Sequence, residues 1–183
     1  MMLSSKMDKN MEKFNKIFNE FISKEYNKNN ENFGLSEIIL NEYQILGDIT
    51  LSQAKDIYKN EFYDKFNLGM IKNSKICGEI FNFGANIGSV ELSIKLLQRS
   101  YNTLNKNMIL KEDGILGEKT ISNINQYKFY KSLYKSINIL QGSFYISLSE
   151  NNENLKVTFI DHEETEGDSY YKEFFRLWVD GIK

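Results

Sequence analysis

An unbroken helical pattern of apolar residues constrains this fold more than any other feature. Apolar side chains recur in alternating steps of four and three at positions 76, 80, 83, 87, 90, 94, 97, 101 and 104, which places them on one face of a helix. Gly84 and Gly88 interrupt this stripe, and each glycine costs about 1 kcal/mol relative to alanine inside a helix. Ser89 can cap a new helix. We therefore predict a helix to about Asn86, a kink, and a second helix to about Tyr101.

Length and charge limit the classes of protein to which the chain can belong. A chain of 183 residues can bury roughly 70% of its unfolded surface, enough for one domain or two small lobes that share a core. Its 23 basic and 25 acidic residues give a net charge of −2, and no face or tail is strongly basic. This balance argues against nucleic acid as a partner.

Cysteine and histidine are too scarce for a disulfide or a zinc site. The single cysteine, Cys77, lies beside Ile76 in the apolar stripe, which favours a small buried hydrophobe over a reactive thiol. The single histidine, His162, cannot hold zinc without nitrogen or sulfur partners. We expect no metal and no cofactor.

The N-terminal segment is polar. Residues 1–10 contain no apolar run of seven or more, so they form neither a secretory signal nor a transmembrane helix. We expect this segment to be frayed, the protein to be made in the cytoplasm, and no part of it to insert into a membrane.

A first helix follows, and its apolar stripe ends on a carboxylate. Phe14, Phe18, Phe21 and Glu25 are spaced by four, three and four residues, so Glu25 continues the buried face. Partial burial would raise the pKa of Glu25, as a general acid requires. The alternative is a solvated last-turn residue whose aliphatic stem covers the stripe.

Two further helices are indicated in the middle of the chain. Residues 37–43 have the pattern of a short amphipathic helix. Thr50 and Gln53 fit a capping box, in which each side chain binds a free amide of the helix start. The apolar face of the helix that follows consists of Ala54, Ile57, Tyr58 and Phe62.

The C-terminal third combines helices with an alternating pattern. We predict helices at 119–126, 129–140 and 169–182. Apolar residues at 144, 146 and 148 and at 155, 157 and 159 alternate with mostly polar ones around a polar turn, which is typical of a β-hairpin. The expected fold class is mainly α with one small β-hairpin near the C-terminus, whose exposed edge could bind a protein partner.

Three motifs in series resemble a known family. They are Phe81–Gly88, with Asn86 before the kink; Leu96-Leu97-Gln98; and Asp113–Thr120, with its Asp-Gly-Ile-x-Gly-x-x-Thr pattern. Together they resemble the peptidoglycan-binding half of glycoside hydrolase family 108, the lysozyme-like N-acetylmuramidases also called secretion activator proteins. The last motif is by itself a turn before a helix, with glycines for positive φ and Asp113 and Thr120 as local hydrogen-bonding groups.

The resemblance implies a domain organisation and a substrate. It implies a lysozyme-like helical fold, in which residues 11–75 form the N-terminal glycosidase lobe and residues 76–183 the C-terminal peptidoglycan-binding lobe. The implied partner is the glycan strand of peptidoglycan, and we expect a monomer. Such an endolysin-like enzyme of a bacteriophage or bacterium would act in the periplasm or cell wall after holin-dependent or signal-independent export.

The resemblance also implies site residues. With Asn32–Ser36 aligned to the family's Tyr-Gly-Ile-Thr, Glu25 falls at the catalytic glutamate and Glu31 near a threonine position. There a second carboxylate could direct water onto the sugar; the alternative is that Glu31 is an exposed loop residue. Tyr26 and Tyr63 are candidate sugar-stacking rings, although either ring could instead pack in the core. Asn86 either lines the sugar cleft or pairs with free carbonyls at the kink.

The loop after Glu25 departs from the family pattern. It lacks the paired glycines, the aspartate and the threonine of the family. Three functions therefore stay open: a muramidase with Glu25 as its acid, a catalytically inactive peptidoglycan-binding or structural protein, and a lytic transglycosylase.

Overall fold

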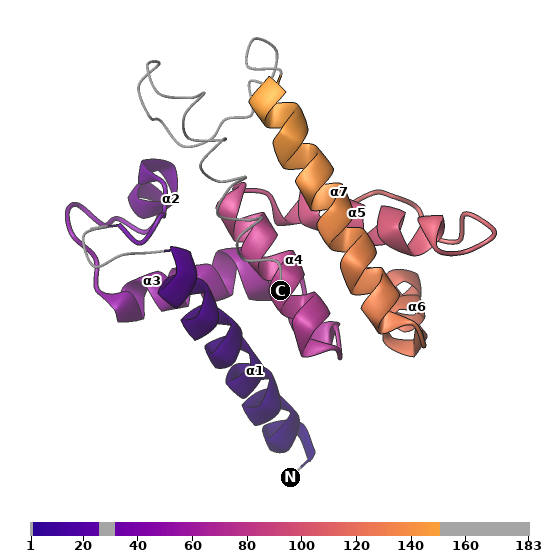
Figure 1. The fold of residues 1–183 in the computed structure, drawn as a ribbon. Coiled ribbons are helices and arrows are strands. Elements are labelled where there is room, and N and C mark those ends of the chain that lie inside the picture. Colours follow the sequence, from indigo (N-terminus) through magenta and orange to yellow (C-terminus); the bar gives the residue numbers. More distant parts are fainter. Residues whose placement is uncertain (1, 26–31, 151–183) are drawn as a thin grey trace.

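The computed structural model describes residues 2–25 and 32–150, and all regular structure within them is helical (Figure 1). The helices are α1 (Met2–Glu25), α2 (Glu37–Glu42), α3 (Leu51–Ile57), α4 (Ser74–Asn86), α5 (Val90–Thr103), α6 (Glu118–Gln126) and α7 (Tyr130–Glu150). A π-helical segment, Tyr58–Asp64, continues α3, and a 3₁₀ turn, Leu68–Met70, precedes α4. The described residues confirm the mainly α class.

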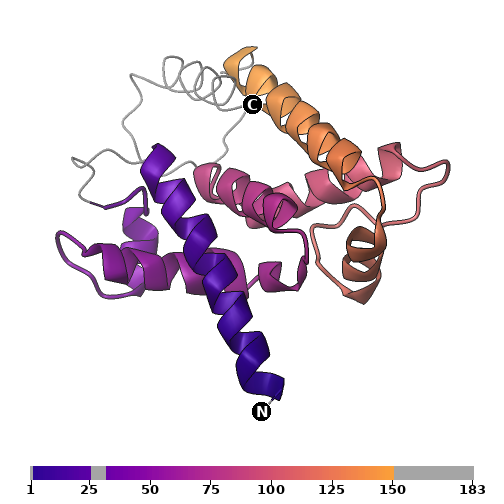
Figure 2. The same ribbon diagram turned by 60° about the horizontal axis from the view of Figure 1, so that its bottom comes forward.

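Helix α4 is the central element. It lies between α1 and α7 in both ribbon views (Figures 1 and 2), and it contacts α1, α5 and α7. Helix α5 packs on both α4 and α7. Side chains on α4 are therefore positioned to act together with residues from both ends of the described chain.

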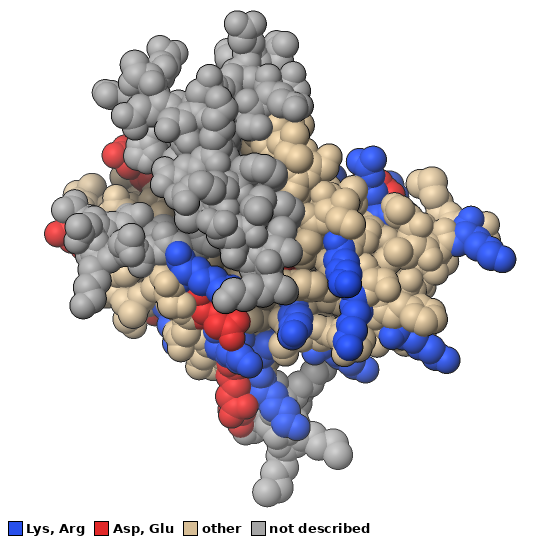
Figure 3. All heavy atoms as spheres, in the orientation of Figure 1, with Lys and Arg blue, Asp and Glu red and all other residues tan. Residues whose placement is uncertain are grey.

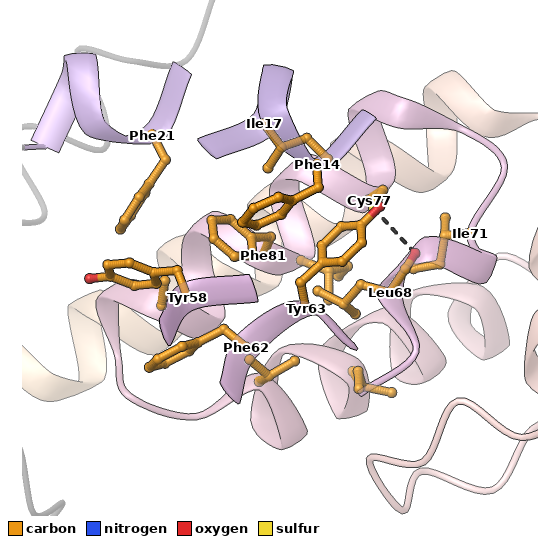
Figure 4. Packing of buried hydrophobic residues seen from close by; sticks show 14 of the residues in the cluster. Phe14, Ile17, Phe21, Tyr58, Phe62, Tyr63, Leu68, Ile71, Cys77 and Phe81 are labelled. Carbon is orange, nitrogen blue, oxygen red and sulfur yellow. Dashed lines mark hydrogen bonds between the residues drawn. The ribbon is translucent and has the colours of Figure 1, made fainter. Parts of the chain in front are cut away.

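A single apolar core joins the two predicted lobes. Phe14, Phe18 and Phe21 of α1 are buried, as the sequence predicted for the first helix, and they pack on Tyr58 and Phe81. Figure 4 shows Phe14 and Phe21 facing these two rings. The same cluster continues through α5 and α6 to Leu133 and Ile137 of α7. The predicted boundary between residues 75 and 76 thus crosses a continuous core.

The predicted kink is present between α4 and α5. Helix α4 ends at Asn86, Gly88 has a φ of +67°, and the Ser89 side chain caps α5 by accepting from the Leu92 amide. Gly84 lets the two helices approach, because a Cβ there would lie 2.8 Å from Val90 Cα. Close packing therefore accounts for the first glycine and the turn for the second.

The capping box is also confirmed, but the helix that it starts changes its winding. The Gln53 amide donates to Thr50 Oγ1, and Gln53 Oε1 accepts from the Thr50 amide. From Tyr58 the chain becomes π-helical. Because a π-helix brings residues five apart onto one side, Tyr58, Phe62 and Tyr63 are all buried.

Two predicted features differ from the structure. Residues 2–10 form the start of α1, and Asn10 accepts a hydrogen bond from Tyr63, so this segment is helical where a frayed end was expected. Residues 144–148, predicted as the first hairpin strand, belong to α7; Tyr145 and Leu148 are buried while Ile146 is exposed, which is a helical pattern. The second strand at 155–159 and the predicted helix at 169–182 lie outside the described residues.

Candidate functional site: a polar stripe on α4

Two of the predicted site residues, Tyr26 and Glu31, lie outside the described residues. Glu25 is the last residue of α1, as predicted, but its side chain is not among those described. The proposed catalytic pair therefore stays a prediction, and the structure fixes only the helix end that carries Glu25.

Tyr63 is a core residue. Its ring is fully buried, with ring centres 5.0 Å from Phe14 and 6.4 Å from Phe81 (Figure 4). Its hydroxyl donates to Asn10 Oδ1 at 3.0 Å, and burial raises its pKa well above the ordinary range. A fully enclosed ring offers no face to a sugar, so the stacking role predicted for Tyr63 is wrong in this structure; the alternative of core packing holds.

Asn86 occupies the end of α4, where the sequence predicted it. Its Oδ1 atom is buried and has no hydrogen-bond partner, and no hydrogen bond of its side chain to the described residues is present. The structure therefore does not support the alternative in which this side chain pairs with free carbonyls at the kink. Its unpaired oxygen leaves a ligand-binding role open.

Asn86 belongs to a polar stripe along α4. Glu79, Asn82 and Asn86 are spaced by three and four residues, which puts them on one face of the helix over about 10 Å; we call these three residues the α4 stripe. Each is partly exposed. The Asn82 Oδ1 atom, like that of Asn86, is buried without a partner.

Glu79 is the acidic residue of this stripe. Its Oε2 atom accepts a hydrogen bond of 3.0 Å from the Tyr134 hydroxyl of α7. Burial is the largest influence on its pKa and raises it above the ordinary value of 4.5, while the hydrogen bond from Tyr134 and the charge of Lys24 act in the opposite direction. The pKa of Tyr134 is in turn raised to about 12 by burial and by the neighbouring carboxylate.

Gln141 of α7 lies beside Glu79. It is fully buried, and it lies two turns beyond Tyr134. Its side chain approaches Glu79 closely enough to lower the pKa of that carboxyl slightly. Neither Nε2 nor Oε1 makes a hydrogen bond of good geometry, so the contact with Glu79 is a weak one and the amide is otherwise enclosed.

The end of α1 borders the same stripe. The positive charge of Lys24 reaches Glu79 and favours its ionised form. Lys24 directly precedes Glu25, and Phe21, one turn earlier on α1, packs on Phe81 of α4, so the end of α1 that carries Glu25 lies against α4. The structure thus places Glu79 and Asn86 on one face of α4, packs the end of α1 against the same helix, and leaves Tyr63 in the core.

The Asp113–Thr120 motif proves to be a structural unit. Gln98, fully buried on α5, donates through Nε2 to Asp113 Oδ1, Ile115 O and Thr120 Oγ1, and its Oε1 accepts from the Gly114 amide. The second and third motifs of the sequence analysis are therefore bound to each other through this one amide.

The two glycines of that motif differ in conformation. Gly114 has a φ of +78°, as predicted. Gly117 has a φ of −74° and is the residue before α6, so the prediction of a positive φ is wrong for this second glycine. Its carbonyl accepts from the Ile121 amide in the first turn of α6.

Charged side chains are unevenly distributed over the described surface. On the face shown in Figure 3, basic side chains predominate over α6 and α7, and the acidic ones lie mostly nearer α1. Lys128, Lys131 and Lys135 are exposed and take part in none of the ion pairs of the described residues. None of the described helices combines the length and apolar content needed to cross a bilayer.

Metal-ligand groups are likewise sparse in the part of the chain that the structure describes. There, no three His, Cys, Asp or Glu side chains lie together in a way that could hold a metal ion. Cys77 is buried, its Sγ donates to Leu68 O, and burial raises its pKa to about 11, in agreement with the prediction of an inert residue.

Comparison with models of known protein families and with curated proteins found nothing that matches this chain. The resemblance to family 108 therefore rests on the quoted motifs alone. Sequence reasoning missed Glu79, Tyr134 and Gln141. A usable signal was present: polar residues at 79, 82 and 86 recur at helical spacing within an otherwise apolar helix.

Proposed function

We propose that the chain is a peptidoglycan hydrolase of the N-acetylmuramidase type, with a lysozyme-like helical fold. The observation that carries the proposal is Glu79, a carboxyl whose pKa is raised by burial next to the end of the helix that bears Glu25. A glycosidase needs a carboxylic acid that stays protonated near neutral pH and a second carboxylate nearby.

The environments suggest separate roles for the two acids. Glu79 donates its proton to the oxygen that leaves with N-acetylglucosamine, as the bond between that oxygen and the anomeric carbon of N-acetylmuramic acid breaks. Glu25 acts as the ionised carboxylate, which either directs water to the anomeric carbon or forms the covalent intermediate that water then hydrolyses. Water supplies the hydroxyl of the new reducing end and the proton that restores Glu79. This exchanges the role that the sequence analysis gave to Glu25.

The test is release of muropeptides from purified peptidoglycan by the wild type and by E79Q and E25Q. New chain ends are reduced with borohydride and identified by mass spectrometry. Glu12→Gln is the matched control, because Glu12 is an exposed residue of α1. We expect reducing muramic ends from the wild type and E12Q, and a loss of at least about 100-fold in E79Q and E25Q.

Each of the other outcomes would assign a different function to the chain or a different role to Glu25. Anhydro ends would show a lytic transglycosylase. Full activity in E79Q with loss in E25Q would restore Glu25 as the acid. Binding to sacculi without release of any product would exclude the enzyme.

A non-catalytic wall-binding or structural protein is the second candidate, and one observation favours it. The Glu79 carboxylate is already engaged by Tyr134, and this hydrogen bond joins α4 to α7 without any chemistry. If the protein belongs to this class, the wild type and the E79Q variant should bind purified peptidoglycan equally well. The basic surface around Lys131 would then carry the contact with anionic wall polymers, and K131E/K135E would release the protein from the wall.

A further inference from the structure

The solvent side of α7 combines positive charge with an exposed apolar side chain. Lys131, Lys135, Ile139 and Ser143 follow one another at intervals of four residues and are all exposed, which puts them on one side of the helix; we call these four residues the α7 outer face. The Ile139 side chain is 68% exposed. Within residues 2–25 and 32–150, neither lysine takes part in an ion pair, and residues 130–149 contain no aspartate or glutamate.

The start of α7 adds to this positive charge. The free amide N–H groups at a helix start act as a partial positive charge, which carboxylates in the first turn commonly offset. The first turn of α7 contains no acidic residue; instead Lys131 is its second residue, and the exposed Lys128 lies just before it. Basic side chains also predominate over α6 and α7 in Figure 3. The outer face is thus suited to an acidic segment that also carries apolar side chains.

The sequence that follows α7 has the complementary chemistry in the reverse order. Along α7 the lysines come first and Ile139 comes later. After Glu150, residues 155–160 are mostly apolar, and the acidic run 161–168 comes next. The carboxylates of this run belong to Asp161, Glu163, Glu164, Glu166 and Asp168. A chain that turns back after α7 and runs antiparallel to it would therefore pass the isoleucine first and the lysines second.

We propose that the α7 outer face is the docking surface for residues 155–168 of this same chain. The apolar side chains of residues 155–160 cover Ile139, and the carboxylates of the acidic run pair with Lys131 and Lys135. This inference is independent of the proposed hydrolase function, because neither carboxylate of that proposal takes part in it.

The lengths on the two sides agree. Because α7 rises about 1.5 Å per residue, Ile139 lies about 16 Å from Glu150 along the helix axis, and Lys135 about 22 Å. If residues 151–154 make the turn, an extended chain that advances about 3.3 Å per residue has covered about 16 Å at Ile160. The acidic run begins at the next residue. The segment therefore changes from apolar to acidic at the distance where α7 changes from isoleucine to lysine.

A segment of the same chain is favoured over an external polyanion for two reasons. Its connection to the end of α7 gives it an effective concentration in the millimolar range, as for other short flexible linkers. It also supplies apolar side chains for Ile139, whereas a purely anionic polymer would pair with the lysines and leave the isoleucine exposed.

Carbodiimide cross-linking of the full chain tests the proposal, because this reagent joins a lysine to a carboxylate only where the two groups touch. The monomeric product is isolated and its linked peptides are identified by mass spectrometry. We expect links from Lys131 or Lys135 to carboxylates of residues 161–168. Their yield should fall at least about fivefold in 1 M salt, where the Debye length is only about 3 Å.

Ile139→Ser is the sharpest variant, because it leaves every cross-linking group in place. Loss of the apolar contact should lower the yield of these links by about fivefold. Ile38→Ser is the matched control, since Ile38 is an isoleucine of α2 that is 64% exposed, close to the value for Ile139. It should leave the yield unchanged. An equal yield in I139S and the wild type would show that residues 155–160 do not cover the isoleucine, and would overturn the proposal.

A charge exchange tests the ionic part. In K131E/K135E/E163K/E164K the two signs change places, so links should form between the exchanged positions. The control is K106E/K119E/E163K/E164K, because Lys106 and Lys119 are exposed residues outside α7. No link should join these two positions to the segment. Absence of links in the α7 exchange would contradict a direct contact.

Two further results would overturn the proposal and identify another occupant. If the links occur only in covalent dimers, the face binds a second copy of the chain. If no link to residues 161–168 forms while K131E/K135E loses its binding to sacculi, the face binds an anionic wall polymer. Both results leave muropeptide release and the role of Glu79 untouched, so failure here is distinct from failure of the proposed function.

Discussion

The Tyr134 hydroxyl donates a 3.0 Å hydrogen bond to Glu79 Oε2 and thereby joins α7 to α4. The bond opposes burial in setting the pKa of Glu79, because it favours the ionised carboxylate whereas burial disfavours it. The fold therefore tolerates a carboxylate that is largely removed from water without fully compensating for its charge.

The first prediction concerns stability against pH. Because the pKa of Glu79 is raised above 4.5 in the folded state, the unfolded chain releases this proton first, and stability is lost as pH rises from about 4.5 through the folded pKa. E79Q can still accept from Tyr134 and carries no charge, so it should unfold at a higher temperature than the wild type at pH 7. Near pH 3 the two should coincide, and an exposed-residue control, E12Q, should follow the wild type at both pH values.

Thermal unfolding followed by circular dichroism between pH 3 and 8 measures this difference. If E79Q were less stable than the wild type at pH 7, the ionised carboxylate would be a stabilising partner of Lys24. The proton-donor role would then lose its physical basis.

A second prediction links Tyr134 to the pH profile of muropeptide release. Y134F removes a donor that lowers the pKa of Glu79, so the carboxyl should stay protonated to a higher pH. If Glu79 is the acid, the alkaline limb of kcat/KM moves to higher pH in Y134F. If the alkaline limb does not move in Y134F, it reports the ionisation of a group other than Glu79.

A third prediction tests the close approach of α4 and α5. In G84A the new Cβ would lie 2.8 Å from Val90 Cα and 2.9 Å from Val90 Cγ2, so urea unfolding should show a loss of about 1–3 kcal/mol. G84A/V90A should recover only part of it, because the contact with the backbone Cα remains. Gly117→Ala is the control, since no atom lies within 4 Å of a Cβ there and its φ of −74° suits alanine.

A fourth prediction concerns the amide that binds the Asp113–Thr120 loop. Q98L loses all hydrogen bonds between Gln98 and the loop and leaves the buried Gly114 amide unpaired, which should cost about 2–4 kcal/mol. Arg99→Ala, at the exposed neighbouring position, should change the free energy of unfolding by less than about 0.5 kcal/mol. Equal urea midpoints for Q98L and the wild type would show that the loop does not depend on this amide.

A fifth prediction concerns Cys77. Its thiol is fully buried and has a pKa raised to about 11, so very little thiolate exists at pH 8 and no reagent reaches it. Ellman's reagent should react with the native protein no faster than the chain unfolds, and immediately in concentrated urea. Rapid labelling of the native protein would place Cys77 in a mobile or open region.

Local signals made much of the fold predictable. The glycine-containing kink at Gly84–Ser89 and the capping box at Thr50 depend on neighbouring residues only, so their geometry could be inferred from spacing. The full extent of α7 could not be inferred from spacing, because the alternation Phe144-Tyr145-Ile146 locally fits a strand. The segment is helical in the structure, where Tyr145 is buried against Phe83 of α4. That contact joins positions far apart in the sequence.

The candidate site was harder to predict for the same reason. Glu79 and Gln141 lie on different helices, and although the spacing of Glu79, Asn82 and Asn86 marks a polar face on α4, nothing in the sequence links that face to Gln141. Their relationship depends on how α7 returns across α4, and on burial, which single-sequence patterns do not report. Tyr63 shows the converse: its placement in the core depends on π-helical winding, for which Tyr58–Asp64 gives no recognisable local signal.

The single core that crosses residues 75 and 76 has a practical consequence for dissecting the molecule. Phe14 and Phe21 of the first half meet Phe81 of the second with ring centres 6.1 and 5.5 Å apart, so neither half can bury its aromatic surface alone. Separately produced halves should be insoluble or unfolded, yet should assemble when refolded together. The two segments are thus suited to split-protein complementation, in which recovery of the folded state reports that both halves have met.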